Sequence, residues 1–103
     1  MKLNVNERIN LMGILPAETN YVTYKIVNEL KTNLSFSEDE IKEYDMRFEE
    51  QMVYFNPVKS KDKEIKIGEK ATDIIVEALE KLDKDNKVND NNISLYEKFI
   101  INT

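Results

Sequence analysis

The chain has 103 residues, a formal net charge of −5 and neither cysteine nor histidine. A chain of this length is expected to form one small domain, residues 1–103, with a single modest core. Without cysteine there is no disulfide and no thiolate metal site, and without histidine the commonest general base and zinc ligand are missing. Composition therefore excludes nucleophile–histidine catalysis and restricts any metal site to carboxylate ligands.

The first residues are not predicted to form a signal peptide. Asn10 and Gly13 interrupt their apolar run, and no small-residue cleavage site follows. No stretch approaches the roughly 18 consecutive apolar residues of a transmembrane helix. We therefore expect a cytoplasmic protein without a membrane partner.

Two helices are predicted near the start of the chain. Asn4 and Glu7 have the spacing of a capping box, for a helix from Val5 to about Ile14 that Pro16 ends. Residues 21–32 are predicted to form a second helix, because their apolar positions recur at helical spacing. The β-branched residues there also fit a strand, but the period favours a helix.

A third, short helix is predicted after Ser37. Ser37 and Glu40 have the spacing of a capping box, and Phe36 and Ile41 occupy the two positions of a hydrophobic staple. This helix is expected to end at Tyr44, where the apolar period changes to two.

Three short strands are predicted next. The alternation from Tyr44 to Phe48 indicates the first strand, and Met52–Phe55 the second, with a polar turn near 49–51 that makes a hairpin. Residues 64–67 alternate again, and we expect them to complete an antiparallel sheet.

The clearest element is a helix over residues 68–84. Its apolar residues form one continuous stripe, which must be buried because an isolated helix of this length is marginal in water. The stripe consists of Ala71, Ile74, Ile75, Ala78, Leu79 and Leu82. A last helix is predicted after a polar linker, with an apolar side of Ile93, Tyr96, Phe99 and Ile100. The predicted fold class is α+β: a small three-stranded antiparallel sheet with the long helix packed on it, an N-terminal helical pair and a C-terminal helix.

Negative charge is concentrated in residues 37–56, which carry seven acids and two bases, so their net −5 equals that of the whole chain. One interpretation is an electrostatic mimic of nucleic-acid phosphate that docks on a basic groove of a partner protein. The alternative is a capped helix and a solvated strand face that happen to be acidic. Hairpin aromatics are usually core, but one face of the sheet is a candidate interface. The candidate partner-binding residues are Glu38, Asp39, Glu43, Asp45, Glu49, Glu50 and Phe55.

Other chemistries fit less well. Two helices, a third helix and a hairpin have the order of a winged-helix domain, but the third helix is the most acidic element, so direct nucleic-acid binding is disfavoured. A calcium loop starting at Asp83 fails at Lys87, Val88 and Ser94. Carboxylate pairs are expected to be exposed, and no phosphate-binding loop or nucleophile elbow is present. We expect no catalytic residue, no metal site, no cofactor and no enzymatic activity.

Four fragments are similar to small, mostly uncharacterised proteins encoded in phages and prophages of low-GC Gram-positive bacteria. The first fragment begins at Asn6-Glu7-Arg8 and ends at Leu15-Pro16. The other three are Leu34–Glu38, Gly68–Thr72 and Leu95–Phe99. The resemblance implies a mobile-element setting inside a host cell and a host protein as partner, but no activity.

Three functions are therefore expected in order. The first is a phage or prophage accessory protein that binds a host or phage protein through an acidic surface, with inhibition of a host nucleic-acid-handling defence complex as one form of that action. The second is a virion-related structural or self-assembling module, a homodimer through the hairpin. The third is a helix-turn-helix-like DNA-binding regulator, which the charge disfavours.

Overall fold

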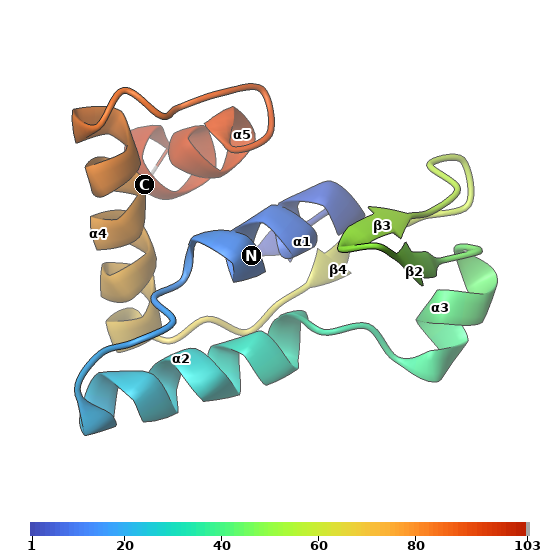
Figure 1. The fold of residues 1–103 in the computed structure, drawn as a ribbon, viewed down its shortest axis with the longest axis horizontal. Coiled ribbons are helices and arrows are strands. Elements are labelled where there is room, and N and C mark those ends of the chain that lie inside the picture. Colours follow the sequence, from blue (N-terminus) through green and yellow to red (C-terminus); the bar gives the residue numbers. More distant parts are fainter. Residues whose placement is uncertain (103) are drawn as a thin grey trace.

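The protein mixes helices with short strands (Figure 1), and the α+β class is confirmed at this level. The structure is a computed structural model that describes residues 1–102. Its elements are β1 (Lys2–Leu3), α1 (Val5–Ile14), α2 (Tyr21–Leu34), α3 (Glu38–Glu43), β2 (Arg47–Glu49), β3 (Met52–Tyr54), β4 (Lys63–Glu64), α4 (Glu69–Lys84), α5 (Ile93–Tyr96) and η1 (Glu97–Ile101), a π-helical turn.

The N-terminal helical pair forms as expected. At the start of α1 the side chain of Asn4 accepts from the Glu7 backbone N–H at 2.8 Å, and the Glu7 carboxylate accepts from the Asn4 N–H at 3.0 Å. These two bonds satisfy backbone donors that a helix start otherwise leaves free. α1 packs against α2.

The predicted three-stranded sheet is not what the structure contains. Within residues 1–102 β2 pairs only with β3, whereas β4 pairs antiparallel with β1 from the start of the chain, with Lys2 opposite Glu64 and Leu3 opposite Lys63. Leu3 and Ile65 are both buried in the main core, which holds these two strands together and away from the hairpin. A two-residue strand such as β1 is too short for an alternating pattern, so the sequence did not indicate it.

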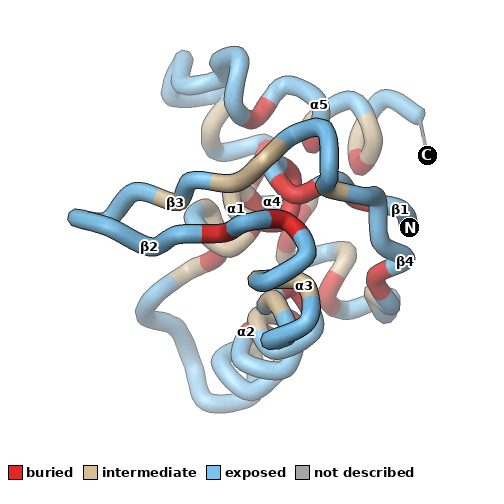
Figure 2. The backbone as a smooth tube through the Cα atoms, turned by 90° about the vertical axis from the view of Figure 1, so that its right-hand side faces the viewer, coloured by how far each residue is buried: buried red, intermediate tan, exposed pale blue. Residues whose placement is uncertain are grey.

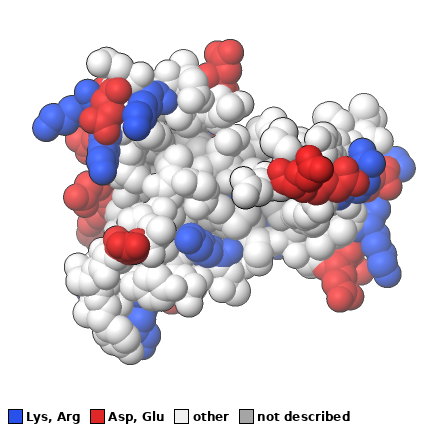
Figure 3. All heavy atoms as spheres, viewed as in Figure 1, with Lys and Arg blue, Asp and Glu red and all other residues white. Residues whose placement is uncertain are grey.

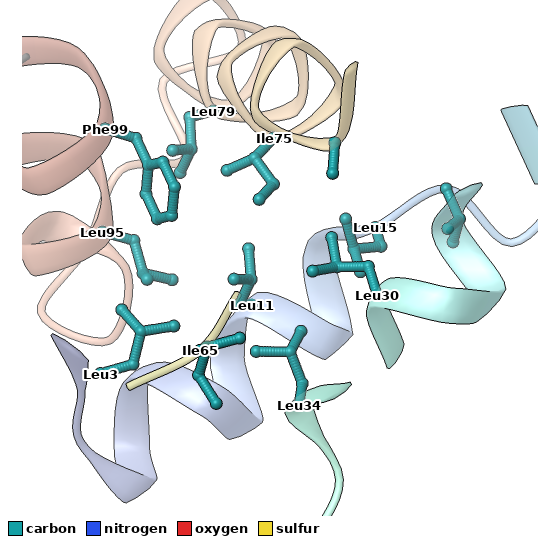
Figure 4. Close-up of a cluster of buried hydrophobic side chains, with 12 residues drawn as sticks. Leu3, Leu11, Leu15, Leu30, Leu34, Ile65, Ile75, Leu79, Leu95 and Phe99 are labelled. Atoms are coloured by element: carbon teal, nitrogen blue, oxygen red, sulfur yellow. The ribbon is translucent and has the colours of Figure 1, made fainter. Parts of the chain in front are cut away.

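The long helix α4 packs against helices rather than on a sheet, contrary to expectation. It contacts α1, α2, α5 and η1. Ala71, Ile75 and Leu79 from its predicted stripe are buried in the main core, and Figure 4 shows Ile75 and Leu79 facing Leu11 of α1. Burying each such Ile or Leu side chain stabilises the fold by about 1.5–3 kcal/mol. The strands are too short to cover this stripe, so the neighbouring helices do.

A second, smaller cluster lies beside the main core. Its buried residues are Val5, Tyr44 and Met46, and the half-buried residues packed against it are Ile9, Phe36, Ile41, Val53 and Phe55. We call residues 37–56, comprising α3, β2 and β3, the hairpin lobe. In Figure 1 this lobe lies at the opposite side of the molecule from α4, and in Figure 2 the β2–β3 hairpin projects from the body.

Within residues 1–102, none of the helices combines the length and the apolar character needed to cross a membrane.

Candidate protein-binding surface

One buried arginine fixes the position of α3. The Arg8 side chain is 0% exposed, and its Nη1 donates to Glu40 Oε2 at 2.6 Å. Its Nε and Nη2 donate to the backbone carbonyls of Leu34 and Ser35 at 3.1 and 2.7 Å. The guanidinium also lies 4.0 Å from the centre of the Phe36 ring. Because all these partners fix its charged head, Arg8 anchors the start of the hairpin lobe to α1.

The Glu40 carboxylate titrates far below its ordinary range. The pKa of Glu40 is lowered from 4.5 to about 2. The hydrogen bond from Arg8 is the largest cause and burial opposes it, while the Ser37 N–H and the charges of Arg8 and Lys63 lower the pKa further. The Ser37 backbone N–H also donates to Glu40, at 3.0 Å, as the second half of the capping box. Glu40 is thus an ionised structural group and not a proton donor or acceptor for chemistry near neutral pH.

The end of α3 turns the chain into the hairpin. The Met46 N–H donates to the Ile41 carbonyl at 2.9 Å, and the Asp45 N–H donates to the Lys42 carbonyl at 3.4 Å. Asp45 has a φ of 52°, so these bonds form a Schellman motif with Asp45 in the left-handed position. The motif places Met46 against Ile41 in the second cluster. The predicted strand from Tyr44 therefore begins only at Arg47.

The hairpin closes through a strained two-residue turn. Glu50 and Gln51 have φ values of 46° and 66°, which is the backbone of a type I′ turn. Asn-Gly is the preferred pair in such a turn because side chains with a Cβ adopt positive φ at a cost. The turn is therefore formed by residues that do not favour it.

Large apolar side chains are exposed along this hairpin. Phe48, Met52 and Tyr54 are 57%, 56% and 43% exposed. The Arg47 guanidinium lies 5.3 Å from the Tyr54 ring centre, and both residues are exposed. The sequence left open which strand face would be exposed, and the structure places Met52 and Tyr54 outside and Val53 half-buried. Phe48 lies opposite Val53, so it is on the other face of the hairpin from Met52 and Tyr54. An exposed apolar pair such as Met52 and Tyr54 is typical of interaction surfaces.

The predicted acidic residues all lie on the hairpin lobe, but three of the six have a basic partner. Glu43 pairs with Lys61 at 3.1 Å, and Asp45 pairs with Lys59 at 3.1 Å. Glu49 lies 3.8 Å from Arg47. Figure 3 shows acidic and basic side chains next to one another over this lobe. The lysine loop, residues 57–63, therefore folds back and offsets part of the negative charge, which the charge count by segment did not indicate.

The other three acids retain their charge without a basic partner. Within residues 1–102 no ion pair joins Glu38, Asp39 or Glu50. Glu38 and Asp39 lie in the first turn of α3, where the helix dipole stabilises them. Phe55 is half-buried in the second cluster, so it supports the hairpin from inside more than it offers a contact.

One surface hollow, of about 1080 Å³, lies between the end of α1, the start of α2 and α4. Tyr96 lines it and donates to Asp83 at 3.1 Å, a bond that raises the pKa of the Tyr96 hydroxyl. Among residues 1–102 no group of three or more acidic side chains is arranged to hold a metal ion.

Comparison of the chain with protein-family models, with curated proteins and with solved structures finds no match.

Proposed function

We propose that the protein acts by binding another protein through the hairpin lobe. The observation that carries this proposal is the exposed pair of Met52 and Tyr54, which shares one face of the hairpin with Arg47 and Glu49, while Phe48 is exposed on the other face. A protein interface commonly has an aromatic and apolar centre with a charged rim. The hairpin offers both within a few residues.

The charge of the lobe favours a partner with a basic surface. In the described part of the chain Glu38, Asp39 and Glu50 form no ion pair, and complementary charge steers association and selects partners. A groove that binds nucleic acid is a common basic surface. The similarity of four fragments to phage-encoded proteins supports a host protein as the partner, and blocking a host complex that handles nucleic acid is one form of this action.

The experiment compares wild-type protein with two triple variants of equal charge change. The first carries Glu38→Lys, Asp39→Lys and Glu50→Lys. The control carries Glu29→Lys, Asp73→Lys and Glu77→Lys, which alter exposed acids on α2 and α4. Each is used to capture proteins from a lysate of a low-GC Gram-positive bacterium, and a captured protein is then purified and titrated directly.

The proposal predicts a partner that binds wild-type protein and the control but loses at least about tenfold in affinity for the first variant, which corresponds to about 1.4 kcal/mol. Duplex DNA should compete with the protein for that partner if the site is a nucleic-acid groove. Equal binding by all three proteins would show that the acidic residues are not the contact surface.

A further inference from the structure

We propose that the free edge of β2 pairs with the same edge of a second copy of the chain, antiparallel and centred on Phe48, so that two hairpins form one four-stranded sheet. Three features of the hairpin favour this pairing: the phase of its hydrogen bonds, the order of the charges along β2 and the exposure of that strand. The pairing uses Phe48 and Glu49 of the hairpin surface proposed above, but it requires no other protein.

The hydrogen-bond phase follows from the turn. In a hairpin with a two-residue loop the residues that flank the loop form a hydrogen-bonded pair, here Glu49 and Met52. The next pair, Phe48 and Val53, is therefore a non-hydrogen-bonded pair, whose backbone N–H and C=O groups point away from the partner strand. On β2 the outward-facing donor and acceptor both belong to Phe48. Two copies of Phe48 facing each other across a two-fold axis would exchange both bonds.

The side chains select this register. Pairing about Phe48 brings Arg47 opposite the second copy's Glu49, and by symmetry Glu49 opposite the second copy's Arg47. Opposite charges that face each other across strands are favourable, and like charges are destabilising. A register centred on Arg47 would place Arg47 against itself, and one centred on Glu49 would place Glu49 against itself. The sequence Arg-Phe-Glu is thus self-complementary in one register and repulsive in the two neighbouring ones.

The edge is open in the single chain. All three residues of β2 are exposed, and the hairpin stands clear of the body in Figure 2. Arg47 and Glu49 are 3.8 Å apart within one strand, with side chains more than half exposed, so their present contact is weak and free to exchange. Unpaired strand edges are ready templates for another chain. The edge of β3 carries no charges that would select one pairing register, because pairing with a second β3 would place Met52 opposite Tyr54.

A short ladder of this kind predicts a dimer that forms with concentration and not an obligate one. The test is sedimentation equilibrium of the purified protein from micromolar to millimolar concentration. Arg47→Glu and Glu49→Arg should each weaken self-association at least about tenfold. The double variant with both changes restores the complementary order and should regain it. A mixture of the two single variants should form mixed dimers. Arg47→Glu carries an acid at both position 47 and position 49, and Glu49→Arg carries a base at both, so the two edges attract each other.

A second variant isolates the backbone. Phe48→Pro removes the outward N–H but no bond of the hairpin's own ladder, so it should abolish dimers while thermal unfolding shows that the chain still folds. A wild-type protein that stays monomeric at millimolar concentration overturns the proposal, as does a dimer that both single variants retain. Because only the purified chain is used, this result is separate from the search for a binding partner.

Discussion

The guanidinium of Arg8 and the carboxylate of Glu40 meet in a two-pronged contact, at 2.6 and 3.3 Å, across 32 residues of chain. Arg8 belongs to α1 and Glu40 to α3, so the pair joins the hairpin lobe to the helical body. Planar guanidinium and carboxylate groups match in this arrangement, which a lysine cannot reproduce. The position of the candidate binding surface therefore depends on one fully buried cation.

Replacing Arg8 should be strongly destabilising. Arg8→Met removes the cation, leaves the Glu40 carboxylate without its buried partner and leaves the carbonyls of Leu34 and Ser35 without their donors. Breaking a buried ion pair in this way typically costs about 3–5 kcal/mol, and urea unfolding at pH 7 measures it. Lys63→Met is the matched control, because Lys63 contacts Glu40 from the exposed side at 3.6 Å. It should cost under about 0.5 kcal/mol, and a similar loss in both variants would contradict this account.

The Glu40 carboxylate should make stability depend on pH in acid. Its pKa is about 2 in the folded protein against an ordinary value of 4.5, so the folded state disfavours protonation. The resulting contribution to the free energy of unfolding is present above pH 4.5 and is lost as pH falls through about 2. At pH 7 it amounts to at most about 3 kcal/mol.

Glu40→Gln tests this pH dependence. Urea unfolding from pH 7 to pH 2 should show a difference from wild type that is largest at neutral pH and shrinks with acidity. Glu43→Gln removes an exposed pair with Lys61 and should change stability little at any pH. A gap between wild type and Glu40→Gln that stays constant down to pH 2 would argue against the coupling.

The hairpin turn should accept better residues. Changing Glu50 to Asn and Gln51 to Gly supplies the pair that a type I′ turn prefers, because both positions have positive φ. We expect a gain of about 1 kcal/mol, seen as a higher midpoint of thermal unfolding. Lys42→Gly, in the regular helix α3, is the opposite control and should cost about 1 kcal/mol. A lower midpoint for the turn variant would show that the turn residues make contacts of their own.

The end of α4 offers a further test of backbone conformation. Asn86 has a φ of 57°, and the Lys87 N–H donates to the Leu82 carbonyl at 2.8 Å, which is a Schellman motif. Asn86→Gly should be neutral or stabilising, whereas Asn86→Val should cost about 1–2 kcal/mol because a branched side chain does not tolerate the left-handed region. Thermal unfolding of the two variants side by side distinguishes them, and equal midpoints would contradict the explanation.

Local signals in the sequence predicted local structure well. The capping boxes at Asn4 and Ser37 begin helices at the expected residues. Of the predicted α4 stripe, Ala71, Ile75 and Leu79 are buried, and the remaining three residues are half-buried. Contacts between distant residues were not predictable in this way. The pairing of β1 with β4 depends on Leu3 and Ile65 meeting in the core, and short strands carry no signal for a partner.

For the acidic surface too, local structure was more predictable than contacts between distant residues. Glu38, Asp39 and Glu43 lie on the predicted helix and Glu50 in the predicted turn, whereas Asp45 precedes the strand expected to contain it and Glu49 lies in β2 instead of the turn. The pairing of Asp45 with Lys59 and of Glu43 with Lys61 depends on how residues 57–63 fold back. The exposure of Phe48 follows from the hairpin projecting beyond the body, which no single-strand pattern specifies. The burial of Arg8 was not predictable either, because an arginine in an amphipathic helix ordinarily lies at the surface.

Helix α1 contributes to both apolar clusters, with Leu11 in the main core and Val5 in the second. The chain therefore cannot be cut into a helical fragment and a hairpin fragment that each keep an intact interior. Amide hydrogens of α1 should be the slowest to exchange with solvent, because opening this helix disrupts both interiors at once. Those of the hairpin should exchange earlier, through openings that leave the helical body in place.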